Sequence, residues 1–391
     1  MSADVIIVGA GIIGAATAFQ LSLAGAGEVL VLDRATAGSG MSCRSSALIR
    51  MHYTFAPEVE LAVRSDAMFG AWPDLVGRPG CVRRTGFVRI VRPGEEAALR
   101  ANVAMQRALG ARAEVIDAAG VKEVAPGLWT DDIECAAWEP DGGYGDGAVV
   151  AGDLLAAARA RGVRYRPNTP VRSLLTDGDR VIGVETGEHG AAPAGREYAG
   201  TVVLAAGVWS PPLLRTAGVT APIETELHRV ALLAHRAGEG APVACIDSVT
   251  ATYFRPEAGG AMTLVGSFAG PRGADPDTGV SATQEDLVPL VRAALSRIPS
   301  LADAGIVGGV TGVYDMTPDA RPLLGRLPGL DGLIVAAGFS GMGFKIAPAV
   351  GESLAGLIAG PARDSVDVTA FRPGRFAEGK PIQAPNPYSD D

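Results

Sequence analysis

The pattern of apolar and polar residues predicts a strand, a helix and a second strand at the start of the chain. Residues 4–8 are mainly apolar and stop at a glycine, which is typical of a buried parallel strand. Residues 12–23 have the composition of a helix, and residues 29–32 form a second short apolar run. This order predicts a βαβ unit and therefore an α/β fold.

Three glycines lie where the first strand meets the helix, and they have the spacing G-x-G-x-x-G. They are Gly9, Gly11 and Gly14, and Asp33 follows the second strand. In a dinucleotide-binding unit such glycines allow a tight turn, a close approach of the pyrophosphate and close packing of the helix. The helix N-terminus attracts phosphate, and the acid accepts hydrogen bonds from a ribose. The motif predicts a nucleotide site; a glycine-rich turn without a ligand is the alternative.

The remaining pattern alternates between segments of both kinds. Buried strands are expected at 202–210 and 332–338, each running into small residues, and the second is followed by a glycine-rich stretch. We expect further strands over 85–91, 163–165, 171–175, 180–186, 224–234, 250–254, 262–268 and 307–314. We expect further helices over 57–72, 95–109, 118–124, 149–161, 284–297 and 346–359.

This distribution predicts two interleaved domains. A Rossmann-like domain that binds the nucleotide is expected from residues 1–82, 141–220 and 305–375. An α+β substrate domain built on an antiparallel sheet is expected from residues 83–140 and 221–304. Residues 376–391 are expected to form a C-terminal tail.

Composition narrows the classes of function. The formal net charge of −9 argues against partners such as nucleic acid or an anionic membrane. No apolar run reaches transmembrane length, and the start of the chain lacks the basic region of a signal peptide. The four cysteines form no C-x-x-C pair and the four histidines show no metal-binding spacing. These features predict a cytoplasmic enzyme with reduced thiols and no metal.

The motifs together resemble the D-amino-acid oxidase superfamily of FAD enzymes, and within it the sarcosine-oxidase and glycine-oxidase branch. The resemblance spans nearly the whole chain. It rests on the glycine fingerprint, Asp33-Arg34, the loop 45–50, the segment 203–209 and, most specifically, residues 336–345.

The resemblance implies that FAD is bound by residues from several separate segments. They are Gly9, Gly11, Ile12, Ile13, Gly14, Asp33, Arg34, Ser42, Arg44, Ser45, Ser46, Ala47, Val171, Ala206, Gly207, Trp209, Gly312, Gly338, Ser340, Gly341, Met342, Gly343, Phe344 and Lys345. Sarcosine oxidases of this type tether FAD through a cysteine where this chain has Gly312, and others through a histidine near the Gly40 loop, where none occurs. FAD is therefore expected to be non-covalent.

The resemblance also implies a site for a carboxylated amine. Lys345 and Arg50 take the positions that bind the substrate carboxylate, and the chain has three lysines in all. Tyr253 and Tyr314 match active-site tyrosines, and His52 follows Arg50 closely. The alternatives are a lysine that only reaches to solvent, tyrosines that fill the core, and a structural histidine.

The function that follows by resemblance is oxidation of a C–N bond by hydride transfer to flavin N5. The substrate would be glycine, sarcosine or a larger N-alkylglycine, the imine product would hydrolyse to a carbonyl compound and an amine, and O2 would reoxidise the flavin to give H2O2. Leu264 stands where sarcosine oxidases carry a lysine that assists the reaction with oxygen. A dehydrogenase with another acceptor, a non-catalytic FAD subunit of a hetero-oligomer and an NAD-dependent enzyme remain as alternatives.

Overall fold

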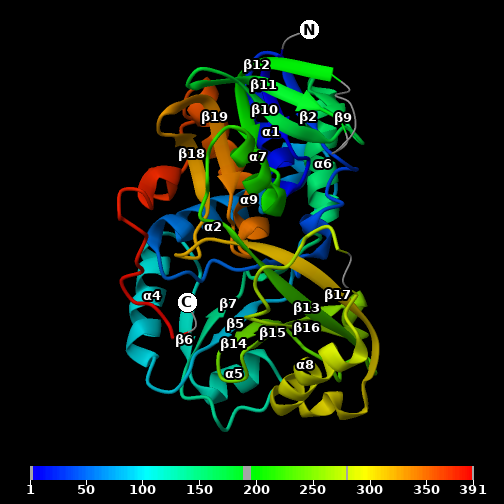
Figure 1. Cartoon of the computed structure of the whole chain (residues 1–391). Helices are drawn as coiled ribbons and strands as arrows, with labels where there is room; N and C mark the ends of the chain where they lie inside the picture. Colours follow the sequence, from blue (N-terminus) through cyan, green and yellow to red (C-terminus); the bar gives the residue numbers. More distant parts are fainter. Residues whose placement is uncertain (1–2, 188–194, 279–280, 390–391) are drawn as a thin grey trace.

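The chain builds two large sheets, one above the other in the view of Figure 1. The structure is a computed structural model that describes residues 3–187, 195–278 and 281–389. Parts of the expected domain division, such as residues 188–194 and 390–391, lie outside the described residues.

The first sheet is centred on β1 (Ala3–Val8), the predicted first strand. Its strands lie in the order β10 (Val171–Asp177), β11 (Arg180–Thr186), β19 (Leu330–Ala337), β12 (Gly195–Leu204), β1, β2 (Val29–Leu32) and β9 (Arg164–Arg166), and β18 (Leu323–Leu327) pairs with β19. β1 is parallel to both of its neighbours, and β10 and β11 form an antiparallel hairpin. The expected parallel sheet of an α/β fold is therefore confirmed.

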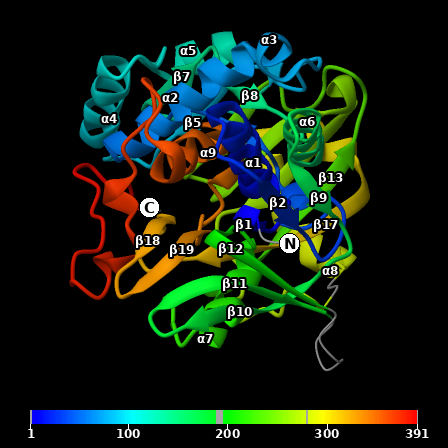
Figure 2. The ribbon, with the colours of Figure 1, turned by 90° about the horizontal axis from the view of Figure 1, so that it is seen from above.

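Both faces of this sheet are buried, which explains its nearly continuous apolar strands. Val5 and Ile7 join a cluster with helices α1 (Ile12–Ala24), α6 (Gly147–Ala160) and α9 (Gly343–Ala359). Ile6 and Val8 point to the other face, toward α7 (Ser210–Thr216) and the β10–β11 hairpin. Figure 2 shows α1, α6 and α9 on one side of the sheet and α7 on the other.

The second sheet is antiparallel apart from one parallel pair, β5 with β14. Its strands lie in the order β17 (Gly305–Met316), β13 (Glu224–Ala234), β16 (Met262–Ser267), β15 (Thr252–Glu257), β14 (Ala244–Asp247), β5 (Phe87–Ile90), β7 (Ala136–Glu139) and β6 (Glu114–Ile116). Helices α5 (Ala118–Val124) and α8 (Gln284–Arg297) cover one face with apolar contacts. Helix α4 (Glu96–Ala108) packs against β6 and β7.

A third, small sheet lies beside helices α2 (Ala56–Gly70) and α3 (Trp72–Val76) and was not expected. Its strands are β3 (Leu48–Ile49), β8 (Gly143–Tyr144) and β4 (Arg83–Arg84). Each has two residues, too few for an alternating pattern to be visible in the sequence. The short strands β7, β14 and β18 were missed for a similar reason.

Two predicted helices have different ends in the structure. The helix expected over 57–72 stops at Gly70, and α3 begins at Trp72. Pro73 follows in its first turn and cannot donate the hydrogen bond that would continue the first helix. The helix expected over 346–359 begins earlier, at Gly343, within the glycine-rich stretch. Phe344, predicted to bind FAD, and Lys345, predicted to bind the substrate carboxylate, therefore lie on the first turn of α9.

The division into domains stays a prediction. One proposed boundary falls at residue 305, the first residue of β17, and β17 pairs along its length with β13 of the second sheet. The tail after α9 runs down the outside of the molecule and ends beside β6 (Figure 1).

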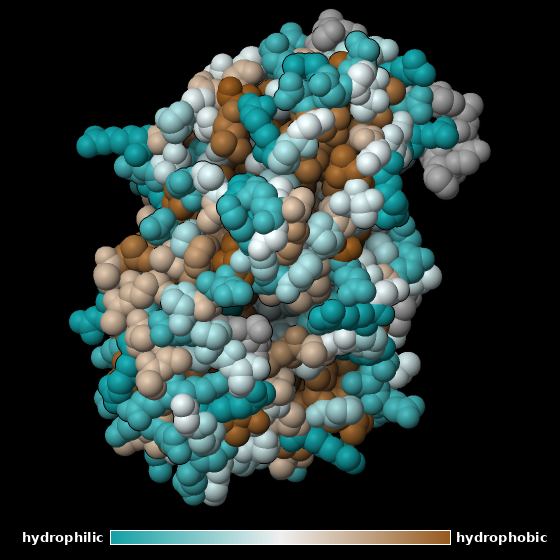
Figure 3. All heavy atoms as spheres, turned by 60° about the vertical axis from the view of Figure 1, so that its left-hand side comes forward, coloured by the Kyte–Doolittle hydropathy of each residue, from teal (hydrophilic) through white to brown (hydrophobic). Residues whose placement is uncertain are grey.

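Within the part of the chain that the structure describes, no helix is long and apolar enough to cross a membrane. The face in Figure 3 is mixed, with apolar side chains in separate patches among polar ones.

Candidate active site

A cavity of about 850 Å³ lies at the carboxyl ends of β1 and β2, next to the N-terminus of α1. This is the edge of a parallel sheet where nucleotides bind in such folds. Half of the residues predicted to bind FAD line it: Gly9, Gly11, Ile12, Ile13, Asp33, Arg34, Ser42, Arg44, Val171, Ala206, Gly207 and Trp209. Segments far apart in the sequence therefore meet where the sequence predicts a nucleotide.

The three fingerprint glycines have different steric surroundings. A Cβ at Gly9 would overlap the carbonyl of Ala205, and one at Gly14 would overlap the carbonyl of Gly9. At Gly11 a Cβ would contact only Ser42 Oγ, at 3.3 Å, and would extend into the cavity. Gly9 and Gly14 thus allow the chain to pack, whereas Gly11 leaves room for a ligand.

Asp33 accepts hydrogen bonds from backbone N–H groups of two segments. One carboxylate oxygen accepts a hydrogen bond from Ala10 N at 2.6 Å, and the other accepts one from Ala35 N at 2.8 Å. Each oxygen keeps a lone pair for a further donor such as a ribose hydroxyl.

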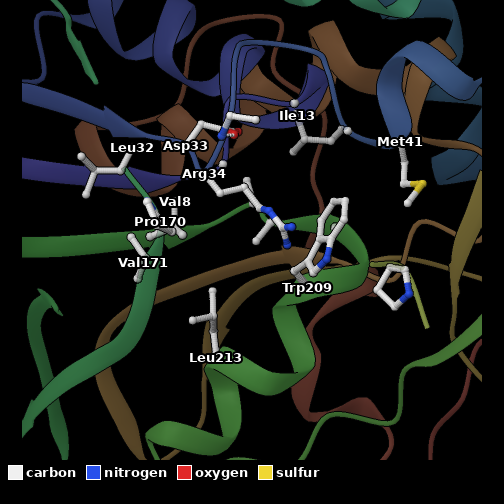
Figure 4. A pocket seen from close by; sticks show the side chains of 18 of the residues that line it. Val8, Ile13, Leu32, Asp33, Arg34, Met41, Pro170, Val171, Trp209 and Leu213 are labelled. Atoms are coloured by element: carbon white, nitrogen blue, oxygen red, sulfur yellow. Dashed lines mark hydrogen bonds between the residues drawn. The ribbon is translucent and has the colours of Figure 1, made fainter. Parts of the chain in front are cut away.

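Arg34 and Trp209 meet across the same cavity (Figure 4). The Arg34 guanidinium carbon lies 4.9 Å from the Trp209 ring centroid. Both side chains contact Asp277 Oδ1, which lies 2.8 Å from Arg34 Nη2 and 3.0 Å from Trp209 Nε1. Asp277 comes from the loop 269–278 after β16 and was missed, because nothing in that polar loop marks a ligand site in the sequence.

A second cavity of about 470 Å³ brings together all five candidate active-site residues. Arg50, His52, Tyr253, Tyr314 and Lys345 line it, and so do Ser45, Ser46, Ser340, Gly341, Met342 and Phe344 from the predicted FAD set. The two cavities use the same two segments: Arg44 and Phe339 line the first cavity, and Ser45 and Ser340 line the second. The two cavities therefore adjoin. The first contains the residues of the predicted nucleotide site, and the second contains the residues of the predicted substrate site.

Five residues of the predicted FAD set line neither cavity: Gly14, Ala47, Gly312, Gly338 and Gly343. Gly14 serves packing, as described above. A Cβ at Gly312 would lie 3.5 Å from the Arg44 Cβ, behind the cavity wall.

Arg50 and Lys345 bring two basic side chains to the wall of the second cavity, both near Tyr53. The Arg50 guanidinium carbon lies 4.3 Å from the Tyr53 ring centroid, and Lys345 Nζ lies 6.0 Å from it on a side chain that is 7% exposed. Arg50 Nη1 donates to His52 O, while buried Arg50 Nε has no hydrogen-bond partner among the described residues. Burial, reinforced by the charge of Arg50, lowers the pKa of Lys345 well below its ordinary value. An anion bound between them would satisfy both groups.

Tyr253 and Tyr314 form a neutral aromatic wall of the same cavity. Their side chains are hydrogen-bonded to each other, and burial raises the pKa of both. A Cβ at Gly266 would overlap the Tyr253 ring, and one at Gly341 would overlap the Tyr314 ring. Each ring therefore occupies space that a neighbouring glycine leaves free.

Two residues of β13 were missed. The His228 ring stacks on Tyr314 with centroids 3.8 Å apart, and His228 Nε2 lies 2.9 Å from Glu226 Oε1. Both line the second cavity, and burial lowers the pKa of His228 against the opposing charge of Glu226. The sequence carries little signal for them, because Glu226 and His228 alternate with Leu227 in the polar first half of β13, which also contains Glu224, Thr225 and Arg229.

Buried carboxylates hold the two loops of the second cavity. Glu139 Oε2 accepts a hydrogen bond from Met51 N at 2.8 Å, next to Arg50. Asp315 Oδ2 accepts one from Gly338 N at 2.6 Å, and Ser340 N donates to the Asp315 carbonyl at 3.0 Å. Burial raises the pKa of Glu139 to about 8 and that of Asp315 to about 6.

Comparison with known proteins identifies the family. The family described as FAD dependent oxidoreductase (DAO) matches residues 4–357 of the chain. The chain belongs to this family. Its cofactor is FAD, and the cradle at Gly11, the Asp33 carboxylate and the N-terminus of α1 fit the dinucleotide part of that cofactor.

Relatives within the family include both oxidases and dehydrogenases. The chain is 30% identical over 382 residues to a formaldehyde-forming 4-methylaminobutanoate oxidase from Paenarthrobacter nicotinovorans, which covers 94% of this chain but 45% of the relative's length. A glycine oxidase from Geobacillus kaustophilus is 28% identical, with 91% of this chain and 92% of the relative covered. The structure of L-proline dehydrogenase from P. horikoshii superposes with a TM-score of 0.87 at 27% identity, over 97% of this chain and 99% of that one. The D-amino-acid oxidase type of fold is thereby confirmed.

Replacement of Gly11 by valine is expected to abolish FAD binding. The side chain would extend into the first cavity where the pyrophosphate must lie. The measurement is the flavin absorbance per mole of purified protein. Gly152→Val in α6 is the matched control, because no atom lies within 4 Å of a Cβ at Gly152. A Gly11→Val protein that carries as much flavin as the control would contradict this placement.

Replacement of Glu139 by glutamine is expected to flatten the pH dependence of stability. The folded protein holds the Glu139 proton up to a pKa of about 8, whereas the unfolded chain releases it near the ordinary value of 4.5. Between these values the unfolded state binds fewer protons, so the stability of the wild type falls as pH rises. The test is the melting temperature of wild type and Glu139→Gln at several pH values. Parallel curves would show that Glu139 does not titrate in this way.

Proposed function

We propose that the protein oxidises the C–N bond of a carboxylated secondary or primary amine of the glycine, sarcosine or N-alkylglycine type. The proposal rests chiefly on one observation: Arg50 and Lys345 line a cavity that adjoins the FAD cavity, and Arg50 keeps a buried donor without a partner. Two basic side chains that line one small cavity favour a ligand with a carboxylate.

Different side chains of the second cavity are proposed to bind the carboxylate and the amine of the substrate. Arg50 grips the carboxylate with its planar guanidinium, and Lys345 adds a point charge beside it. The rings of Tyr253 and Tyr314, whose hydroxyl pKa values are raised so that both stay neutral, form a wall that favours the uncharged amine over the ammonium form. His52 lines the carboxylate end of the cavity. FAD supplies the acceptor for the hydride, while the protein holds the reacting carbon in place.

We propose that FAD is held without a covalent bond. No cysteine is among the described residues that line the two cavities. Gly312, where related enzymes carry a tethering cysteine, lies behind the wall. The two histidines of the second cavity have other partners, since His52 Nε2 contacts Tyr388 and His228 Nε2 contacts Glu226. The four cysteines are free thiols, which favours a reducing compartment such as the cytoplasm.

Oxygen is the acceptor that we favour, and another electron acceptor is the second candidate. Leu264 supports the second candidate, because its side chain is buried in an apolar cluster with Leu48, Phe87 and Tyr253 and brings no positive charge to the flavin side of the sheet. A relative such as the L-proline dehydrogenase from P. horikoshii bears a dehydrogenase name.

Acid precipitation is expected to release intact FAD into the supernatant, because the site offers no tether. Chromatography of the supernatant and absorbance of the pellet measure the two fractions. Flavin that remains with the washed pellet would overturn the non-covalent assignment.

Replacement of Lys345 by methionine is expected to weaken the apparent affinity for a carboxylated amine by roughly 1–3 kcal/mol, the size of a charge-assisted hydrogen bond. FAD content should not change. Steady-state KM values give the measurement, and Lys122→Met, on the exposed side of α5, is the matched control. Unchanged KM values in both Lys345→Met and Arg50→Met would refute the proposal that Arg50 and Lys345 bind the substrate carboxylate.

The test of the function as a whole compares amines with and without the carboxylate. Anaerobic bleaching of the flavin is followed with glycine, sarcosine, larger N-alkylglycines and the matching amines that lack the carboxylate. Fast bleaching by the carboxylated series alone is expected, and a peroxide assay in air then separates oxygen from another acceptor. Equal bleaching rates for the matched pairs would contradict the proposed substrate class.

A further inference from the structure

The end of the chain returns to the second cavity and forms part of its wall. We name residues 382–389 the C-terminal strap. It lies at the end of the red trace in Figure 1, close to β6. Tyr388, in the strap, is 4% exposed and lines the second cavity together with Arg50 and Lys345. A residue far from every motif in the sequence therefore borders the proposed substrate.

Hydrogen bonds hold the strap along its whole length. Ile382 N donates to Asp319 Oδ2 at 2.9 Å, and Asn102 Nδ2 of α4 donates to the Asn386 carbonyl at 2.9 Å. Ser389 N donates to Glu95 Oε1 at 2.8 Å. The bonds at Asn386 and Ser389 lie on both sides of Tyr388, so they hold the backbone of Tyr388 in place independently of the contacts of its ring.

Tyr388 closes the cavity at the end where Arg50 lies. Its hydroxyl is 2.8 Å from His52 Nε2, and the two rings are nearly parallel, with centroids 5.8 Å apart. The guanidinium carbon of Arg89 lies 5.0 Å from the Tyr388 ring centroid. His52 in turn accepts a hydrogen bond from Arg50 through its carbonyl. The ring thus stands beside His52 and Arg89, and it is linked to Arg50 through His52.

We propose that Tyr388 is a specificity-determining residue that limits the number of carbons between the amine and the carboxylate of the substrate. This inference rests on the function proposed above. A ligand whose amine is held at the flavin end can extend toward Arg50 only as far as the Tyr388 ring. An additional methylene between amine and carboxylate would drive the carboxylate into that ring.

Removal of the ring should lengthen the cavity at this end. The space that it leaves lies between His52 and Arg89, two polar side chains that already line the cavity. A carboxylate displaced by one methylene could then enter this space and face polar groups instead of an aromatic ring. The accepted class would extend from N-methylglycine to N-methyl-ω-amino acids such as N-methyl-β-alanine.

The test compares sarcosine and N-methyl-β-alanine as substrates of the FAD-loaded wild type, Tyr388→Ala and Tyr388→Phe. The quantity measured is the ratio of kcat/KM for N-methyl-β-alanine to that for sarcosine. It is expected to rise by about tenfold or more in Tyr388→Ala, the usual scale for one methylene in a pocket. Tyr388→Phe keeps the ring and should keep the wild-type ratio.

Binding without turnover gives an independent readout. Methylthioacetate and 3-(methylthio)propionate have the two chain lengths but no amine, and their dissociation constants can be measured from changes in the flavin spectrum. Tyr388→Ala should bind the longer acid relatively more tightly. Tyr198→Ala is the matched control, since Tyr198 is 43% exposed on β12 and lines neither cavity.

The outcomes separate the two proposals. If the wild type oxidises sarcosine but Tyr388→Ala shows the wild-type ratio in both readouts, the role of Tyr388 is refuted and the proposed function stands. A loss of activity toward both substrates in equal measure, with unchanged ratio, would likewise show a structural role only. If the wild type oxidises neither substrate and binds neither acid, the proposed function fails and Tyr388 has no such role.

Discussion

The architecture of the site depends on carboxylates that hold backbone N–H groups of its loops. Asp33 holds Ala10 and Ala35 beside the first cavity, Glu139 holds Met51 and Asp315 holds Gly338 beside the second. A loop has no ladder of its own to satisfy these donors, and a buried donor without a partner is costly. Each carboxyl group therefore helps to fix the backbone around a cavity. Glu139 and Asp315 do so without lining either cavity.

The same loops also explain why two chambers can share a wall. The chain passes from the first cavity to the second between Arg44 and Ser45 and again between Phe339 and Ser340. Because adjacent residues face different cavities, a shift of either segment would alter both. The loop 269–278 adds a third link, since Ala269 lines the second cavity and Asp277 the first. The two cavities are thus lined by one connected set of segments.

Much of the nucleotide chamber was predictable because its signal is local. Gly9, Gly11, Gly14 and Asp33 have fixed spacings within one βαβ unit, and their surroundings in the structure agree with the roles assigned to them. Arg50, His52, Tyr253, Tyr314 and Lys345 were named by resemblance to a family, and they do line one cavity. Asp277, Glu226, His228 and Tyr388 were not named, because their roles arise only from the packing of distant segments. Glu139 and Asp315 were missed since a buried acid that serves the backbone looks like a surface acid in the sequence.

The residues that line the two cavities are spread over nearly the whole chain, which affects when a site can form during synthesis of the protein. The nucleotide fingerprint is complete after the first 33 residues, yet the first cavity also needs Ala205, Asp277 and Phe339, and the second needs Tyr388. A nascent chain on the ribosome therefore carries the recognisable motif long before it has a site that can bind a ligand. Because most of these contacts are distant in sequence, FAD cannot stabilise an early intermediate and can select only the nearly finished fold.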